Sequence, residues 1–180
     1  AVLQSSSFIV NEPFSLLLGD DVYVGNCNKP VLKQLIDAYD NVLSSVIGMI
    51  YVNEDEVSKL GICEFDTTEL SKTHKLIGVQ EKPALAEAKS RYAIGGRYIL
   101  SPTIFKYLDS QEKGNANEIQ LTDAILRMMS EEAVYGYEID GRRYDIGSRV
   151  GYIDAILDFA LRRNDLKNEV LELIKSKISN

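Results

Sequence analysis

Apolar residues along this 180-residue chain occur in blocks, and the spacing inside each block predicts its secondary structure. The first clear block, residues 14–18, is apolar except for Ser15 and is followed at once by Gly19, Asp20 and Asp21. An apolar run of this kind is typical of a strand that is buried on both faces, as in parallel sheets. Because ligands bind beyond the carboxyl ends of such strands, the acidic pair is a candidate functional site.

The blocks that follow predict a strand, helix and second strand in succession. Residues 29–43 carry apolar side chains at helical spacing, and Pro30 suits the first turn of that helix. Residues 45–52 are rich in apolar side chains and predict a second buried strand. This order of elements indicates an α/β protein with a parallel sheet.

The remaining elements follow from the same patterns. We expect strands over residues 61–65, 76–80, 92–100 and 134–139, and helices over 54–59, 102–108 and 118–129. Residues 66–75 are polar and predict a hairpin or loop, while Asp140-Gly141 is a strong hairpin-turn signal. Two helices are expected within residues 150–177, with a break near Asn164.

Composition and charge narrow the classes of function. The contents of 45% hydrophobic and 26% charged residues are typical of a globular protein and argue against disorder. Because no internal repeat or linker divides the sequence, we expect a single domain over residues 1–180. A net charge of −7 argues against nucleic-acid binding, because phosphate contacts need clustered Lys and Arg. It still allows a small phosphorylated ligand, which a metal ion and a few cations can hold. No apolar stretch reaches the length that spans a membrane, so no membrane partner is expected.

The cysteines and the single histidine exclude several kinds of chemistry. Cys27 and Cys63 are far apart and do not form a zinc motif, and two free thiols indicate a reducing, cytoplasmic location. His74 is the only histidine, and its polar neighbours predict a solvated loop residue rather than a catalytic base. Without a catalytic histidine, the Ser–His and Cys–His nucleophilic schemes are not expected.

Two acidic motifs carry candidate chemistry. Asp20 and Asp21 offer hard oxygen ligands for Mg²⁺, although the pair can also open a turn or cap a helix. Asp145 follows Tyr144 just before a predicted turn, and by itself it is compatible with an ordinary turn aspartate.

A second pair of motifs offers contacts to a ligand. Glu81 can accept hydrogen bonds from hydroxyl groups and Lys82 can neutralise a phosphate, and the alternative is a surface ion pair before the turn at Pro83. Gly95 and Gly96 interrupt a strand-like run, which indicates a bulge or the close approach of a ligand.

Taken in order, six motifs of this chain resemble the bacterial UTP–glucose-1-phosphate uridylyltransferases (UDP-glucose pyrophosphorylases), members of the sugar nucleotidyltransferase family. The motifs lie at residues 18–21, 59–62, 80–83, 96–100, 118–125 and 143–147. The most specific ones are Gly-Arg-Tyr-Ile-Leu at 96–100 and Glu-Ile-Gln-Leu-Thr-Asp-Ala-Ile at 118–125. The resemblance implies a three-layer, Rossmann-like α/β fold with a mixed, mostly parallel sheet and C-terminal helices from about residue 150 to 180.

The same resemblance implies that the N-terminal part of the family's catalytic domain is missing. The opening Ala-Val-Leu-Gln is similar to a family segment that follows the uracil-contacting loop. The Gly-rich loop that holds the nucleotide and the residues that recognise the base are therefore expected upstream of Ala1.

The resemblance also implies roles for individual residues. Asp20 and Asp145 are similar to the two acids that share one Mg²⁺, and together with Lys82 they are the implied catalytic residues. The implied substrate-binding residues, which lie along the sugar and its phosphate, are Gly61, Glu81, Lys82, Gly95 and Gly96.

This chain departs from the family's pattern at three of the implied sugar-side positions. Gly95 stands where the family commonly has Val, and Leu60 and Cys63 replace the usual Tyr and Val. These departures leave open the shape of the protein surface that would face the sugar. For Asp21, we expect a supporting role next to the metal ligands.

The implied reaction is the attack of glucose 1-phosphate on the α-phosphorus of UTP, which gives UDP-glucose and pyrophosphate. It implies Mg²⁺ as cofactor, a homo-oligomer, and little or no turnover by these 180 residues alone. Two alternatives stay open: a thymidylyl- or adenylyltransferase that acts on glucose 1-phosphate, and a non-catalytic module that binds a nucleotide sugar or another subunit.

Overall fold

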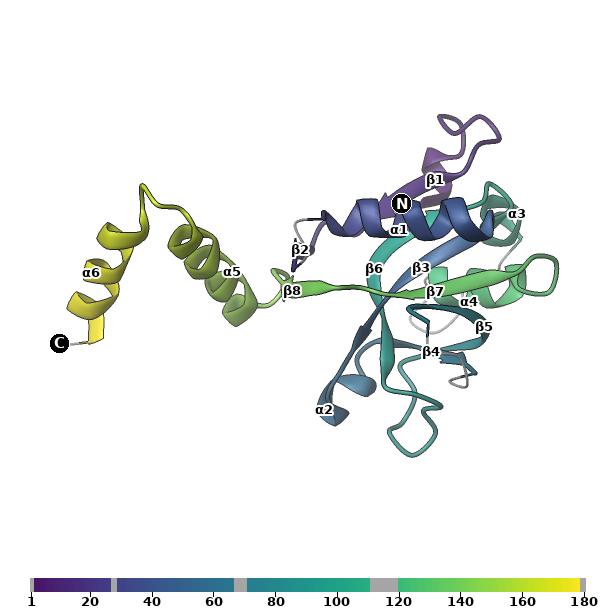
Figure 1. Cartoon of the computed structure of the whole chain (residues 1–180). Coiled ribbons are helices and arrows are strands. Elements are labelled where there is room, and N and C mark those ends of the chain that lie inside the picture. The colour runs from purple at the N-terminus through teal and green to yellow at the C-terminus, as the bar shows by residue number, and fades with distance from the viewer. Residues whose placement is uncertain (1, 27–28, 67–70, 111–119, 179–180) are drawn as a thin grey trace.

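The structure is a computed structural model that describes residues 2–26, 29–66, 71–110 and 120–178 (Figure 1). The described elements, in chain order, are the 3₁₀-helix η1 (Val2–Ser5), β1 (Phe14–Leu17), β2 (Asp21–Gly25), α1 (Val31–Val42), β3 (Ser45–Tyr51), α2 (Glu54–Val57), β4 (Gly61–Phe65), β5 (Thr73–Glu81), β6 (Tyr92–Leu100), α3 (Ile104–Asp109), α4 (Leu121–Met128), β7 (Val134–Glu138), β8 (Gly141–Asp145), α5 (Arg149–Arg162) and α6 (Lys167–Ile178).

The main sheet is mixed, as expected, with the strand order β1-β6-β3-β7-β5-β4. Among the described strands only β3 and β7 form a parallel pair, so the expectation of a mostly parallel sheet is wrong. The reason is β6, which is buried along almost its whole length and lies antiparallel to β1 on one side and to β3 on the other. A strand that is covered on both faces has a continuous apolar sequence, whether its neighbouring strands are parallel or antiparallel to it.

The sheet curls back on itself at β4. This strand pairs antiparallel with β5, and one bridge between Ile62 and Ala93 also joins it to β6. The curl brings the first residue of β4 and the last residue of β5 close to the start of β6.

The first apolar block forms an edge strand and is not buried on both faces. In β1 the exposed residues Ser15 and Leu17 alternate with the half-buried residues Phe14 and Leu16. The apolar run therefore predicted the strand correctly but its environment wrongly, because β1 has only β6 as a neighbour among the described strands. Phe14 stacks on Phe105 of α3, with ring centroids 5.2 Å apart, and this contact covers one face of the strand.

The predicted hairpin at Asp140-Gly141 is also wrong. The strand β8 after this turn does not return along β7 but pairs antiparallel with β2 in a separate two-stranded ribbon. The buried side chain of Gln34 on α1 explains the change of direction, because it binds the backbone of Asp140 twice. Its Oε1 accepts from the Asp140 N–H at 3.0 Å, and its Nε2 donates to the Asp140 carbonyl at 2.9 Å.

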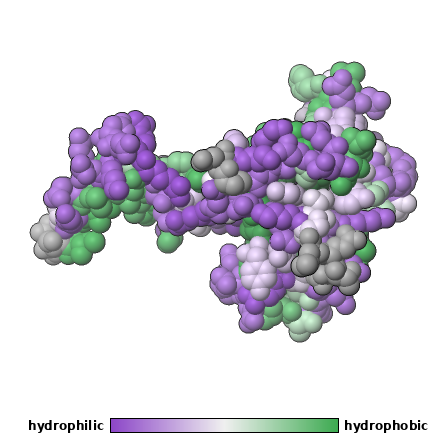
Figure 2. All heavy atoms as spheres, in the orientation of Figure 1, coloured by the Kyte–Doolittle hydropathy of each residue, from purple (hydrophilic) through white to green (hydrophobic). Residues whose placement is uncertain are grey.

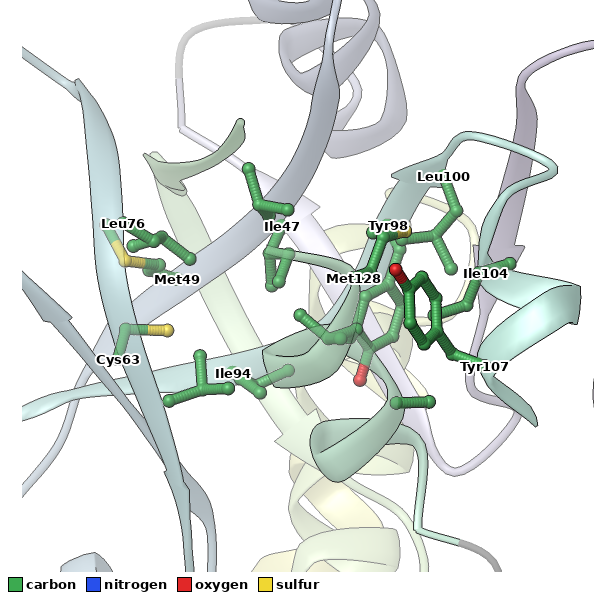
Figure 3. Close-up of a cluster of buried hydrophobic side chains, with 14 of the residues drawn as sticks. Ile47, Met49, Cys63, Leu76, Ile94, Tyr98, Leu100, Ile104, Tyr107 and Met128 are labelled. Atoms are coloured by element: carbon green, nitrogen blue, oxygen red, sulfur yellow. The ribbon is translucent and has the colours of Figure 1, made fainter. Parts of the chain in front are cut away.

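The largest core cluster fills the space inside the curled sheet (Figure 3). It joins side chains of β3, β4, β5 and β6 to those of α3 and α4, among them Ile47, Cys63, Ile94, Ile104 and Met128. A second cluster packs α1 against β3 and β6 through Leu35, which is fully buried. Core burial of this kind, rather than local propensity, holds short helices in place.

His74 is buried, contrary to the prediction of a solvated loop residue. It lies in β5, which begins earlier than expected, and its ring is 4.5 Å from the ring of Phe65. Its Nε2 is 2.8 Å from Oε1 of Glu138. Polar neighbours along the chain did not reveal this burial because alternate residues of a strand point to opposite faces.

The other elements largely follow the predicted boundaries. The strands β4 and β6 have the expected bounds, and the two C-terminal helices break where they were expected to. The start of the helix expected over 118–129 lies outside the described residues, as does Cys27. Whether the chain forms a single domain stays a prediction.

The C-terminal arm, which we define as α5 and α6 (residues 149–178), extends away from the sheet (Figure 1). It is joined to β8 by polar contacts, including two hydrogen bonds of 2.8–2.9 Å from Arg142 to the Asp154 carboxylate. Several of its large apolar side chains are exposed, and Figure 2 shows hydrophobic surface along the arm. They include Val150, Tyr152, Ile153, Ile156 and Phe159. Within the part of the chain that the structure describes, no helix combines the length and apolar character needed to cross a bilayer.

We predict that Leu35→Ala strongly destabilises the protein. Leu35 is fully buried between α1 and the sheet, so its truncation should lower the free energy of unfolding by about 2–5 kcal/mol. The matched control is Leu173→Ala in α6, where the side chain is 57% exposed, and it should change that free energy by no more than about 0.5 kcal/mol. Denaturant unfolding of both variants measures the difference, and equal effects would contradict the packing of α1.

Candidate active site

The ribbon of β2 and β8 brings two aspartates together that are far apart in the sequence. Asp21 lies opposite Asp145 in the register of the ribbon, and the N–H of Ile146 donates to the backbone carbonyl of Asp20 at 2.8 Å. A Cβ atom placed on Gly147 would lie 3.2 Å from Oδ1 of Asp145 and 3.6 Å from Oδ2 of Asp20. Two exposed carboxylates thus converge on one turn, and the expectation that they share a metal ion stays a prediction.

The turn after β8 holds the Asp145 carboxylate in place. The N–H of Gly147 donates to its Oδ1 at 3.1 Å, and the Ser148 hydroxyl donates to its backbone carbonyl at 3.1 Å. Ser148 is the N-cap of α5, because its hydroxyl oxygen accepts from the N–H of Gly151 at 3.0 Å. The position of Asp145 therefore depends on the first turn of α5.

Asp21 lies beneath this acidic pair and is buried. Its carboxylate forms an ion pair with Arg143, and Arg97 donates to its backbone carbonyl. Burial raises the pKa of the Asp21 carboxyl, and the Arg143 guanidinium opposes that shift. A buried carboxylate with a dedicated cation is poorly placed to bind a metal ion, which fits the expected supporting role.

Gly96 makes room for the Asp21 side chain. It adopts a positive φ of 65°, which favours glycine, and an added Cβ atom would lie only 2.3 Å from Oδ2 of Asp21. The glycine interruption of β6 therefore marks a close approach within the protein, between the sheet and the ribbon.

The predicted sugar-binding residues form a second group around the ends of β4 and β5. Glu81, the last residue of β5, lies opposite Gly61, the first residue of β4. A Cβ atom on Gly61 would lie 3.4 Å from Oε2 of Glu81. The Nζ atom of Lys82 is 3.5 Å from Oε1 of Glu81, and the Lys82 side chain is 58% exposed.

The backbone at Lys82 is constrained. Its φ of 45° is rare for a residue with a side chain, and its N–H donates to the carbonyl of Leu60 at 3.1 Å. Strain of this kind gathers at functional sites. Glu81 and Lys82 line a cavity of about 520 Å³ together with Gln120 and Asp123.

The strand β6 links the two groups. Gly96 contacts Asp21 at one end, and the side chain of Ile94 lies 3.0 Å from a Cβ atom on Gly61 at the other. β6 thus contacts both groups at positions two residues apart, a span of roughly 7 Å along a strand. That spacing suits a ligand with an anionic group near the carboxylates and hydroxyl groups near Glu81.

Gly95 lies against the hydroxyl group of Tyr23. The Tyr23 hydroxyl donates to the Gly95 carbonyl at 2.6 Å, and a Cβ atom on Gly95 would lie 2.6 Å from that hydroxyl oxygen. Burial raises the pKa of the Tyr23 phenol. The space that a side chain at position 95 would need is thus filled by Tyr23, a residue that the sequence motifs did not single out.

Cys63 and Leu60, the other two residues that depart from the family's pattern, pack against apolar clusters. Cys63 is fully buried in the main core cluster, and burial raises the pKa of its thiol to about 12. Leu60 packs against a small cluster formed by Val52, Val57, Ile62 and Ala93. Neither side chain is among those that line the cavity next to Glu81 and Lys82.

The donor set of the acidic pair fits a magnesium ion. Mg²⁺ binds oxygen ligands and usually combines one or two carboxylates with phosphate oxygens and water. Asp20 and Asp145 supply two such carboxylates, and the residues that the structure describes contain no cluster of three or more potential metal-binding His, Cys, Asp or Glu side chains. An ion at this position would therefore need oxygens from a ligand to complete its coordination.

The sequence motifs did not single out Arg143, Gln120 or Asp123 as residues of the candidate site. Arg143 belongs to the motif at 143–147, and the other two belong to the motif at 118–125, so the signal was present but could not assign them roles. Only the folded chain places Arg143 against Asp21 and the other two beside Lys82.

The mixed sheet, the helices that flank it and the two-stranded ribbon at its side form a nucleotidyl transferase fold. The chain belongs to the nucleotidyl transferase family, whose model matches residues 1–161.

Individual relatives agree with this assignment. The chain is 43% identical over 178 residues to UTP–glucose-1-phosphate uridylyltransferase 1 of Staphylococcus saprophyticus, with 98% of this chain and 60% of the relative covered. It is 42% identical over 175 residues to the UTP–glucose-1-phosphate uridylyltransferase of Staphylococcus haemolyticus, with 97% and 60% covered. The chain thus spans about 60% of the length of the curated relatives that it matches.

Solved structures give the same result for the fold. A UDP-glucose pyrophosphorylase in complex with UDP-glucose superposes with a TM-score of 0.84 at 35% identity, over 90% of this chain and 61% of that one. A UTP-bound enzyme of the same name from Acinetobacter baumannii gives a TM-score of 0.85 at 29% identity, over 96% and 59%.

We predict that Gly96→Ala destabilises the protein. The new Cβ atom would meet Oδ2 of Asp21 and would require an unfavourable positive φ, so the free energy of unfolding should fall by about 1–3 kcal/mol. The matched control is Gly19→Ala, where no atom lies within 4 Å of the new Cβ, and it should change stability by less than about 1 kcal/mol. Thermal unfolding of the two variants compares them, and a fully stable Gly96→Ala variant would contradict this packing.

Proposed function

We propose that this chain is the sugar-phosphate-binding and metal-binding part of a UTP–glucose-1-phosphate uridylyltransferase. The observation that carries the proposal is the convergence of Asp20 and Asp145 on Gly147, together with the Glu81–Lys82 pair at the end of β5. The names of the relatives at 42–43% identity support the choice of substrates, which are UTP and glucose 1-phosphate. The products are then UDP-glucose and pyrophosphate.

Each residue has a distinct part in the proposed reaction. Asp20 and Asp145 would hold Mg²⁺, which when bound offsets the charge of the phosphates. Lys82 would pair with the phosphate of the sugar, and Glu81 would accept hydrogen bonds from its hydroxyl groups. Gly61 would let the sugar approach the backbone closely.

The glycines of β6 have a supporting part in the same proposal. Gly96 lets the sheet approach Asp21, and Gly95 leaves room for Tyr23. We propose that the pair Gly95 and Tyr23 together forms the wall that faces the sugar, in place of the side chain that is common in the family.

The reaction needs alignment more than acid–base chemistry. An oxygen of the sugar phosphate attacks the α-phosphorus of UTP in line with the leaving pyrophosphate, so one P–O bond forms as another breaks. No covalent bond to the protein is required. The task of the chain's residues is to align two anions that repel each other, and alignment of this kind supplies much of the rate enhancement in such enzymes.

The choice of base is tested by assaying the protein, as it is expressed from its gene, with glucose 1-phosphate and Mg²⁺ plus UTP, dTTP or ATP. We expect UDP-glucose and pyrophosphate from UTP, with at least a tenfold preference over the other two nucleotides (about 1.4 kcal/mol). A preference for dTTP or ATP would show that the enzyme uses that nucleotide instead of UTP. Binding of glucose 1-phosphate, with no product formed from any of the three nucleotides, would favour a non-catalytic module.

The metal site is tested by measuring the binding of a metal ion to the 180-residue chain. We propose that this chain by itself shows little turnover, so binding is measured instead of activity. Mn²⁺ is the probe, because its binding is measured by electron paramagnetic resonance. Asp145→Asn removes one of the two carboxylates and should weaken Mn²⁺ binding in the presence of glucose 1-phosphate at least tenfold (about 1.4 kcal/mol).

The control for this experiment is Asp165→Asn. Asp165 lies between α5 and α6 in the C-terminal arm, where it is exposed and paired with Arg163, so its replacement should leave Mn²⁺ binding unchanged. Equal binding by both variants and the unaltered chain would refute the metal site.

We also propose that the protein forms homo-oligomers in the cytoplasm. The exposed apolar side chains of the C-terminal arm, such as Ile153 and Ile156, support self-association, and the free buried thiol of Cys63 fits a reducing compartment. Sedimentation of the unaltered protein should show an oligomer that Ile153→Asp shifts toward the monomer. A monomer at micromolar concentration would contradict self-association.

A further inference from the structure

The side chain of Thr122 makes a hydrogen bond that no part of the proposed reaction requires. Its hydroxyl donates to Oε2 of Glu81 at 2.7 Å, across the gap between α4 and the end of β5. A Cβ atom on Gly61 would lie 3.3 Å from the Thr122 oxygen and 3.4 Å from Oε2 of Glu81. The hydroxyl and the carboxylate therefore meet directly beside the glycine at the start of β4.

The two oxygens of the Glu81 carboxylate have different neighbours. Oε2 accepts from Thr122, whereas Oε1 lies 3.5 Å from Nζ of Lys82. The distance to Lys82 is long for a charge-assisted hydrogen bond, which is usually about 2.7–2.9 Å. The Thr122 bond thus holds the carboxylate while leaving the lysine loosely paired.

The donor is on a rigid support. Thr122 lies in the first turn of α4, and the opposite face of that helix is fully buried in the core through Ala124, Ile125 and Met128. A threonine side chain also has few rotamers in a helix. The hydroxyl therefore has a fixed position relative to the sheet, and the carboxylate that it binds takes the same fixed position.

We propose that Thr122 is a positioning residue that orients the Glu81 carboxylate toward the hydroxyl groups of the sugar. It also keeps Glu81 from closing on Lys82 and neutralising the cation that pairs with the sugar phosphate. This inference rests on the proposed roles of Glu81 and Lys82.

The test is the kinetics of Thr122→Val in the protein as it is expressed from its gene. Valine keeps the shape of threonine and removes only the donor. We expect the KM for glucose 1-phosphate to rise about tenfold while the KM for UTP stays within about twofold, because a hydrogen bond to a charged group is lost on the sugar side alone. Thr122→Ser restores the donor and should bring the KM back to within about threefold of its original value.

A double-mutant cycle shows whether Thr122 acts through Glu81. In a Glu81→Gln background the carboxylate is already gone, so adding Thr122→Val should raise the KM for glucose 1-phosphate by less than about twofold. Full additivity of the two substitutions would overturn the proposal. An equal rise in the KM values of both substrates would also overturn it, because that result indicates a general structural defect.

The control variant is Thr73→Val, the same substitution at the opposite end of β5. It should leave both KM values unchanged, and thermal unfolding of all variants checks that each one folds. Failure of the proposed function has a different signature, because the unaltered protein would then form no UDP-glucose and no KM could be measured.

If Thr122→Val does not fold, binding of glucose 1-phosphate to Thr122→Ser and Thr122→Ala replaces the kinetics. Calorimetry should then show tight binding by the serine variant and binding about tenfold weaker by the alanine variant. Equal affinities would overturn the proposal.

Discussion

The ion pair between Asp21 and Arg143 ties the two strands of the ribbon together, and Arg97 of β6 donates to the backbone carbonyl of Asp21 and so links the ribbon to the main sheet; the geometry of the candidate site depends on these contacts. Asp21 is buried against Gly96 in the middle of β6, while Arg143 comes from the opposite strand of the ribbon. A buried carboxylate without a cation would be costly, so the two strands are held in one register by their charges. That register places Asp145 opposite Asp21 and next to Asp20.

Central strand β6 gives the site its second constraint. It pairs with β1 and β3 and touches β4, so residues from most of the sheet are placed relative to it. Its two glycines remove side chains where the ribbon approaches, and Tyr23 fills the space beside Gly95. The ribbon next to the acidic pair and the start of β4 next to Glu81 therefore both contact β6, although these parts of the chain are remote in sequence.

Each group of polar residues is also held by the beginning of a helix. Ser148 at the N-terminus of α5 holds the backbone of Asp145, and Thr122 in the first turn of α4 holds the carboxylate of Glu81. The helix α5 begins just after β8, whereas α4 is remote in the sequence from β5. A site built in this way is rigid without being enclosed, which suits the alignment of two large anionic substrates.

The sequence alone determined the elements and the identity of the polar residues. Periodicity located α1, β4, β6 and the two C-terminal helices, and the motifs named Asp20, Glu81, Lys82 and Asp145, because these signals are local. The tertiary structure decided which elements pair. The antiparallel course of β6, the exit of β8 toward β2 and the burial of His74 depend on contacts between distant residues, such as Gln34 with Asp140. Local patterns cannot contain those contacts, since each is selected by the free energy of the whole packed chain.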